Sequence, residues 1–143
     1  MAYRERLAWI ELVGMAIAYG AYFIAVGLVE PAPGRLETLS YVALFGAATG
    51  VRLLILGLGW LLLRARMGGE ARARPDERDR AIARRGASVG YYVLLGLMLW
   101  VGVILPLTQS GWAVANAALA AIIVAEIVRD VVIVFSYRGG WHG

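Results

Sequence analysis

Four apolar runs, each long enough to cross a lipid bilayer as a helix, constrain this 143-residue chain more than any other feature. They cover about residues 7–29, 38–63, 87–107 and 112–135. A helix needs about 20 residues to cross ~30 Å of hydrocarbon, because each residue adds ~1.5 Å. We therefore predict an all-α integral membrane protein with four spans.

The composition supports the membrane class and excludes several kinds of site. Hydrophobic residues make up 61% of the chain and charged residues 17%, with a mean hydropathy of +0.70. Soluble domains are nearer about 45–50% apolar and about 25% charged. The chain has no cysteine, and its one histidine, His142, lies outside the apolar runs. Thiolate and haem sites are therefore excluded, and we expect no metal and no cofactor.

The connections between the runs predict how the spans pair. Residues 30–35 read Glu-Pro-Ala-Pro-Gly-Arg, a turn of helix breakers, and residues 106–111 are short and uncharged. Short connections place consecutive spans side by side in opposite directions. We predict one domain over residues 1–143, a four-helix bundle made of two antiparallel transmembrane hairpins.

Arginine placement predicts the orientation. The segment 64–86 holds eight arginines, and Arg4, Arg6 and Arg138 lie near the chain ends, whereas the other side has only Arg35. Positively charged loops stay in the cytoplasm, so both termini and the loop 64–86 are predicted to be cytoplasmic. We expect residues 7–29 to be a retained span and not a signal peptide, because the run is long, contains Glu11 and leads into another span.

Small residues and an internal similarity suggest how helices meet. Gly46 and Gly50 have the GxxxG spacing that lets helix backbones approach closely. We interpret this pair as packing inside the bundle, with a seam between two copies as the alternative. The halves also share a pattern that either a parallel repeat or chance would explain: Glu5, Arg6, Ile10, Gly14 and Tyr19 recur as Glu77, Arg78, Ile82, Gly86 and Tyr91.

Five ionisable residues fall inside the apolar runs: Arg52, Glu11, Glu126, Arg129 and Asp130. A lone charge at mid-bilayer costs at least ~2.5–3.5 kcal/mol, so pairing is expected. Depth along the helices pairs Arg52 with Glu126, and Glu11 with Arg129. Glu126, Arg129 and Asp130 also share one helical face.

Three roles remain open for these five residues. They form a polar clamp that fixes helix register, or a pocket that binds an ion, a proton or a small charged solute, or a contact with a partner subunit. Nearer the membrane surface, long side chains can also extend to the headgroups. The five residues are therefore candidates for a ligand or ion pocket.

The loop 64–86 contains a second set of candidates. Pro75 and Asp76 have the positions of a helix start, acids occupy the first turn and arginines follow, so a helix is predicted to run on into the third span. Such a segment sets topology and contacts lipid headgroups, or it docks a cytoplasmic protein. Its mixed charges argue against nucleic acid. The candidate contact residues are Asp76, Glu77, Arg78, Arg80, Arg84 and Arg85.

The stretch DERDRAIARRGASVGYY resembles an Asp-Glu-Arg-Asp element that precedes a helix hairpin in uncharacterised small bacterial multi-pass membrane proteins. The resemblance covers about residues 75–135. It implies a multi-pass protein of the bacterial inner membrane and no particular reaction. Some of these proteins are encoded beside small helix-turn-helix regulators, which would suit a regulatory partner.

No pattern typical of an enzyme occurs in the sequence: metal ligands, a nucleophile–base pair and a phosphate-binding glycine loop are all missing. We therefore expect a protein that is not an enzyme, that binds or moves an ion or small charged solute, and that forms a homo-oligomer because four spans enclose little volume. The alternative is a membrane-anchored regulatory or scaffold protein.

Overall fold

The computed structural model describes residues 3–28, 35–69, 74–109 and 111–139, and long helices dominate it. They are α1 (Tyr3–Leu28), α2 (Arg35–Arg66), α4 (Glu77–Leu99) and α5 (Trp112–Arg138). The all-α prediction is confirmed, and each helix contains one of the predicted apolar runs, apart from residue 29 and the last part of the third run. Most of the predicted turn at residues 30–35 lies outside the described residues.

The sequence of α4 and of the residues that follow it accounts for where this helix begins and ends. Asp76 caps its start, and its carboxylate accepts a hydrogen bond from the backbone N–H of Asp79 at 2.6 Å. The loop helix predicted from this motif therefore exists and continues directly into the third apolar run. Near its end, α4 widens to a π-turn over Trp100–Ile104 and then tightens to a 3-10 turn over Leu105–Leu107. Pro106 cannot donate the usual backbone hydrogen bond, which accounts for the irregular end.

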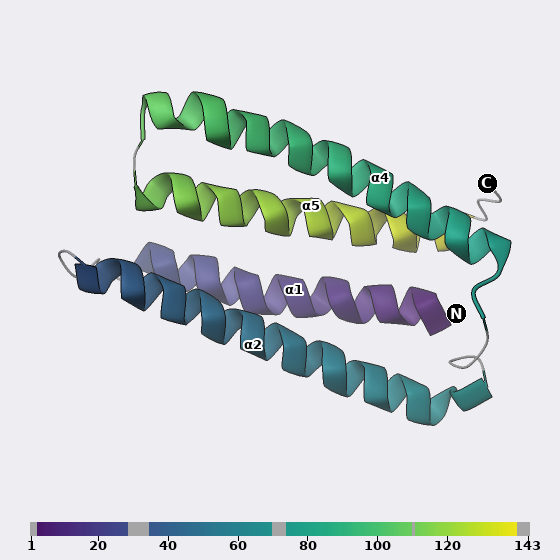
Figure 1. Ribbon diagram of the computed structural model, residues 1–143. Helices are drawn as coiled ribbons and strands as arrows, with labels where there is room; N and C mark the ends of the chain where they lie inside the picture. The colour runs from purple at the N-terminus through teal and green to yellow at the C-terminus, as the bar shows by residue number, and fades with distance from the viewer. Residues whose placement is uncertain (1–2, 29–34, 70–73, 110, 140–143) are drawn as a thin grey trace.

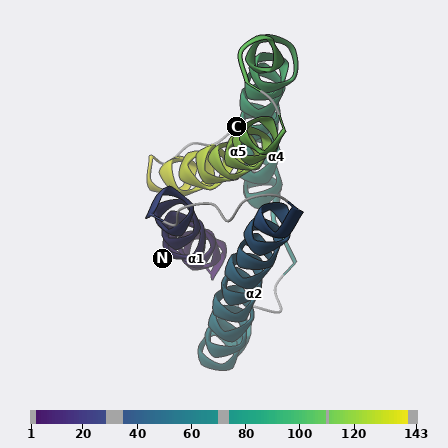
Figure 2. The ribbon, with the colours of Figure 1, turned by 90° about the vertical axis from the view of Figure 1, so that its left-hand side faces the viewer.

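The four helices form a bent row in the order α2, α1, α5, α4 (Figures 1 and 2). Helix α1 packs on α2, α4 packs on α5, and α1 and α5 meet in the centre. Neighbouring helices run in opposite directions (Figure 1). Because α2 and α4 each have one main neighbour, the arrangement is open at its edges. The four-helix bundle of the sequence prediction implied a more closed packing.

The row gives the molecule one charged end. The start of α1, the start of α4 and the last turns of α2 and α5 all lie there (Figure 1). We call this the arginine-rich end, because it holds the described arginines of residues 64–69 and 74–85 together with Arg4, Arg6 and Arg138 (Figure 1). The end of α1, the start of α2 and the start of α5 lie at the opposite end, as does the end of the segment that follows α4 (Figure 1).

The core lies at the central contact of α1 with α5. Met15, Tyr19 and Ile123 form its buried cluster. Phe45 of α2 closes the cluster from one side, with its ring centroid 5.7 Å from that of Tyr19. Tyr22 donates a hydrogen bond to the side-chain oxygen of Asn116 at 3.0 Å, which joins α1 to α5 beyond the cluster.

Glycines set the closest helix contacts, but these are not the glycine pair predicted from the sequence. A Cβ added to Gly86 would lie 2.6 Å from Ile133, and one added to Gly90 would lie 3.1 Å from the Cβ of Arg129. Gly86 and Gly90 are therefore the GxxxG pair that packs α4 on α5. Gly46 and Gly50 have no atom within 4 Å of such a Cβ. Their predicted packing inside the bundle is wrong.

The suspected repeat is only partly reflected in the packing. Gly14 lies against Ile55 of α2, and its counterpart Gly86 lies against α5, so both glycines face the next helix of their own half. Tyr19 is buried, however, whereas its counterpart Tyr91 is 60% exposed. An axis along the membrane normal would give α1 and α4 equivalent places, yet α1 is central and α4 is at the edge.

Three helical segments are long and apolar enough to cross a membrane: Tyr3–Leu28, Leu39–Arg66 and Glu77–Leu107. The most apolar stretch of the second segment has none of its residues buried inside the protein. Leucines at its surface, including Leu54, Leu58 and Leu62, are each more than half exposed. These helices therefore present a large apolar surface that water would not solvate favourably. Helix α5 is not one of the three.

Candidate functional site

Arg129 is the centre of a charged cluster on α5. Its guanidinium contacts Glu126 at 2.8 Å, on its own helix, and Glu11 of α1 at 3.1 Å. Its Nε also lies 3.2 Å from Asp130. The predicted contact of Glu11 with Arg129 is therefore present. The single guanidinium of Arg129 contacts three carboxylates, so the cluster has an excess of negative charge when all its members are ionised.

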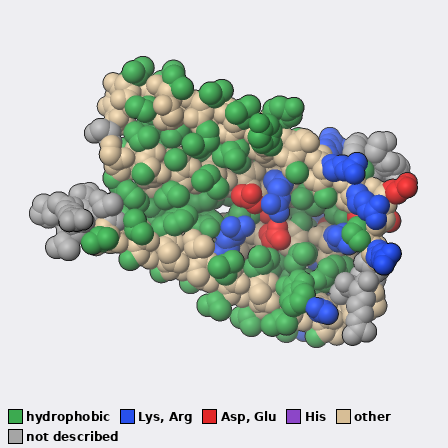
Figure 3. Space-filling view, in the orientation of Figure 1, with side chains coloured by type: hydrophobic (Ala, Val, Ile, Leu, Met, Phe, Trp, Pro, Cys, Tyr) green, Lys and Arg blue, Asp and Glu red, His purple; other side chains and the backbone are tan. Residues whose placement is uncertain are grey.

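The cluster is accessible from one side of the molecule. The side chains of Arg129 and Glu126 are 34% and 37% exposed, and that of Glu11 is 21% exposed. Acidic and basic side chains gather near the middle of an otherwise largely hydrophobic face (Figure 3). A charged group at that level is unfavourable in lipid unless it is paired, hydrated or covered.

Asp130 differs from the other acids because it is buried. Its side chain is 1% exposed, and neither carboxylate oxygen has a hydrogen-bond partner in the described part of the chain. The contact with Arg129 is thus electrostatic without good hydrogen-bond geometry. A buried carboxylate without hydrogen bonds is costly, which marks Asp130 as a strained member of the cluster.

The predicted pairing of Arg52 with Glu126 is wrong. The Arg52 guanidinium instead lies over the ring of Tyr19, 5.7 Å from its centroid, and forms no ion pair with any described residue. The cause is the order of the helices: α2 packs on α1 and has little contact with α5, while Glu126 is held by Arg129. Arg52 and Glu126 were predicted to lie at similar depths in the membrane, but a similar depth is not enough to place their side chains in contact.

Arg52 and Glu126 nevertheless face the same small cavity. It has a volume of about 180 Å³ and lies between α1, α2 and α5. Aromatic residues Tyr19 and Phe45 form part of its wall. The other lining residues are aliphatic: Met15, Leu119, Ile122 and Ile123. At ~30 Å³ for each water molecule, the space corresponds to about six waters or one small solute.

Asp79 organises a second charged cluster at the arginine-rich end. It accepts a hydrogen bond from the Tyr137 hydroxyl at 2.7 Å and pairs with Arg4 at 2.9 Å. Burial is the main cause that raises the pKa of Tyr137, and the hydrogen bond to Asp79 is the next largest. The Tyr137 hydroxyl therefore stays protonated and donates. Arg78 also donates to the backbone carbonyl of Tyr137 at 3.4 Å. These contacts join the starts of α1 and α4 to the last turn of α5.

The predicted contact residues of the loop separate into two groups. Asp76 and Arg78 make contacts within the protein, as a helix cap and as a donor to α5. Arg85 lies beside α5 in a small surface pocket. The remaining three residues are exposed and have no ion pair within the described residues: Glu77, Arg80 and Arg84.

Several residues that hold these clusters are not among those predicted from the sequence. Glu5 is buried and pairs with Arg138 at 3.4 Å, and Arg138 lies over the ring of Trp9. Tyr19 lies beneath Arg52. An acid in the first turn of α1 was the available signal for Glu5, but its partner is 133 positions away. Nothing in the sequence indicates which aromatic ring lies under an arginine.

The described residues contain no group of three or more histidine, cysteine or acidic side chains placed to hold a metal ion. No protein family, no curated protein and no solved structure matches this chain.

Proposed function

We propose that this chain is a four-span protein of the bacterial inner membrane that binds a small charged solute and moves it across the membrane. Three apolar helical segments support membrane residence. Helix α5 would be the fourth span, and its contact with Glu11 would lower the cost of placing Arg129 in the membrane. The arginine-rich end would lie in the cytoplasm.

The main support for solute binding comes from the surroundings of the Arg52 guanidinium. Its charge has no carboxylate partner in the described residues, and it faces a cavity of about 180 Å³ that Glu126 also lines. An anionic group bound at Arg52 would supply the missing partner. The negative excess around Arg129 would suit a cationic group or a proton. The site therefore fits a small anion or zwitterion and suggests binding or transport rather than enzymatic chemistry.

Substitution of Arg52 tests this proposal. We expect the purified protein to bind at least one member of a panel of small anions and zwitterions, measured by titration calorimetry, and R52L to lose that binding. E126Q should alter the affinity or its dependence on pH. The matched control is R64L, because Arg64 is on the same helix, is exposed and lies over Trp60 away from the cavity.

Two results would reject the solute site. The first is unchanged binding and assembly in both R52L and E126Q. The second is absence of binding in the wild type together with a higher stability of R52L, since removal of an unneeded charge from an apolar region stabilises a protein. The second result would favour the regulatory alternative, in which Glu77, Arg80 and Arg84 contact a cytoplasmic protein. That alternative is tested by capture of such a partner on wild type but not on E77A/R80A/R84A.

We also propose that the protein works as a homo-oligomer. The open edge of α2 supports this, because Gly46 and Gly50 face empty space there. The two glycines would let an α2 helix of a second copy approach closely. Such a seam replaces the intramolecular packing that the GxxxG spacing first suggested.

A further inference from the structure

A wedge-shaped cavity separates α1 from α2 near the arginine-rich end. The two helices touch at Gly59, where an added Cβ would lie 2.7 Å from Ile10, and they diverge from there toward that end (Figure 1). The divergence leaves a cavity of about 800 Å³. This volume is several times that of the cavity beside Arg52.

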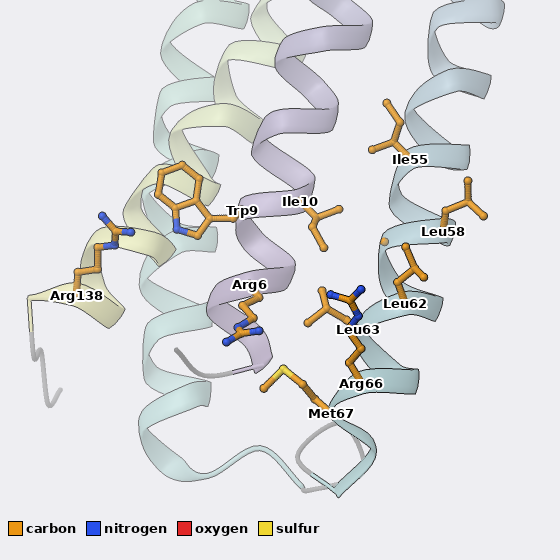
Figure 4. Close-up of a pocket in the computed structure, with 11 residues that line it drawn as sticks. Arg6, Trp9, Ile10, Ile55, Leu58, Leu62, Leu63, Arg66, Met67 and Arg138 are labelled. Carbon is orange, nitrogen blue, oxygen red and sulfur yellow. The ribbon is translucent and has the colours of Figure 1, made fainter.

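The walls of the cavity change in character along its length. Apolar side chains of both helices, including Ile10, Ile55 and Leu62, line its inner part (Figure 4). Arginines line it nearer the end: Arg6 from α1 and Arg66 from α2, with Arg138 from α5 beyond Trp9. The cavity is therefore apolar inside and cationic at its mouth.

Two of these arginines have charge available for a ligand. Arg6 and Arg66 form no ion pair with any described residue, whereas Arg138 is paired with Glu5. In Figure 4 the Arg66 side chain extends from α2 into the gap between the two helices. A phosphate group between Arg6 and Arg66 would provide oxygens for charge-assisted hydrogen bonds.

The apolar walls distinguish a lipid from a soluble anion. Leu58 and Leu62 line the cavity and are also 59% and 61% exposed, so the cavity opens sideways onto the apolar surface of α2. An acyl chain entering from that side would cover apolar area that a free phosphate would leave empty. The arginines lie at the end where lipid headgroups would be found if that end faces the cytoplasm.

We propose that this wedge is a binding site for one anionic phospholipid. Its phosphate lies between Arg6 and Arg66, and the first part of an acyl chain lies against Ile55, Leu58 and Leu62. The lipid holds α1 and α2 apart at this end. The site shares no lining residue with the cavity of Arg52 and Glu126, so either site can be lost without the other.

Lipid binding by native mass spectrometry tests the site. Delipidated protein in detergent is titrated with phosphatidylglycerol, and with phosphatidylcholine of the same chains as the zwitterionic comparison. We expect the wild type to retain one phosphatidylglycerol per chain. In R6A/R66A the affinity for phosphatidylglycerol should fall by about tenfold or more, because two arginine–phosphate contacts are removed. The control R64A/R74A removes the same charge from exposed positions that do not line the wedge, and it should leave the affinity within about twofold.

A second variant keeps every charge and protects the test against a folding defect. L62W fills the apolar part of the wedge, and we expect it to weaken phosphatidylglycerol binding while the helical circular dichroism stays unchanged. Equal binding of the two lipids, or equal losses in R6A/R66A and R64A/R74A, would overturn the proposal. Full competition by inorganic phosphate would also overturn it, because the ligand would then be a free anion.

Discussion

At the scale of single residues, Arg129 and two glycines of α4 depend on one another. Arg129 contacts carboxylates of α1 and of its own helix, which fixes the direction of its side chain. Its Cβ and backbone lie against α4, where Gly86 and Gly90 leave the necessary space. A larger side chain at either glycine would therefore push α4 away from the helix that carries the charged cluster.

We predict that G90L destabilises the protein. An added Cβ would lie 3.1 Å from the Arg129 Cβ and 3.2 Å from the Ala125 carbonyl oxygen, and the rest of the leucine has no space. Overpacking of this kind costs about 1–3 kcal/mol. The free energy of unfolding in mixed micelles, followed by circular dichroism, measures the effect.

The control for this prediction is G96L. Gly96 is in the same helix but has no atom within 4 Å of an added Cβ, so the substitution should not destabilise the protein and should gain up to about 1 kcal/mol of helix propensity. Both variants replace glycine by leucine, so they gain the same helix propensity. A G90L protein as stable as G96L would mean that α4 and α5 are not closely packed at Arg129.

At the scale of the helices, the sequence determined where each helix lies along the chain but not which way its faces point. Apolar length placed the bounds of α1, α2 and α5 within a few residues of those observed, and Asp76 marked the start of α4. The GxxxG spacing occurs at Gly46 and at Gly86, and spacing alone does not distinguish an inward pair from an outward pair. Only the neighbouring helix decides that difference.

The outward direction of Gly46 and Gly50 leads to a prediction about α2. We expect G50C to form a disulfide-linked dimer when membranes are treated with a mild oxidant, because a second α2 helix would approach at this face. The chain has no native cysteine, so any dimer on a non-reducing gel reports that position.

The matched variant for this experiment is G96C on α4. Gly96 also faces open space, but its helix is at the other edge of the row. We expect little dimer from G96C. Dimer from neither variant, or equal amounts from both, would remove the support for a seam at α2.

At the scale of the whole molecule, the order of the helices explains which charge pairs were predictable. Glu11 and Arg129 lie on the adjacent helices α1 and α5, so matching their depths was sufficient. Arg52 lies on α2, which is an edge helix with little contact with α5. Depth follows from counting residues along a helix, whereas helix order follows from packing that involves the entire chain.

The start of α1 and the end of α5 lie at the arginine-rich end, together with the end of α2 and the start of α4 (Figure 1). We therefore predict that this end faces the cytoplasm. We expect Q109C, between α4 and α5, to react with a membrane-impermeant thiol reagent in spheroplasts, and G139C to react only after lysis. Both positions are exposed, and the native chain contributes no background thiol. The reverse labelling pattern, or equal labelling of both positions, would contradict the orientation.

The contact of Glu11 with Arg129 also bears on how the protein is made. The two residues are 118 positions apart, so α1, α2 and α4 are all synthesised before the pair can form. In the proposed topology, α1 and α2 therefore enter the membrane while Glu11 lacks this basic partner. Helix α5 therefore completes the charge balance of α1, and a nascent chain that stopped before α5 would leave Glu11 without Arg129.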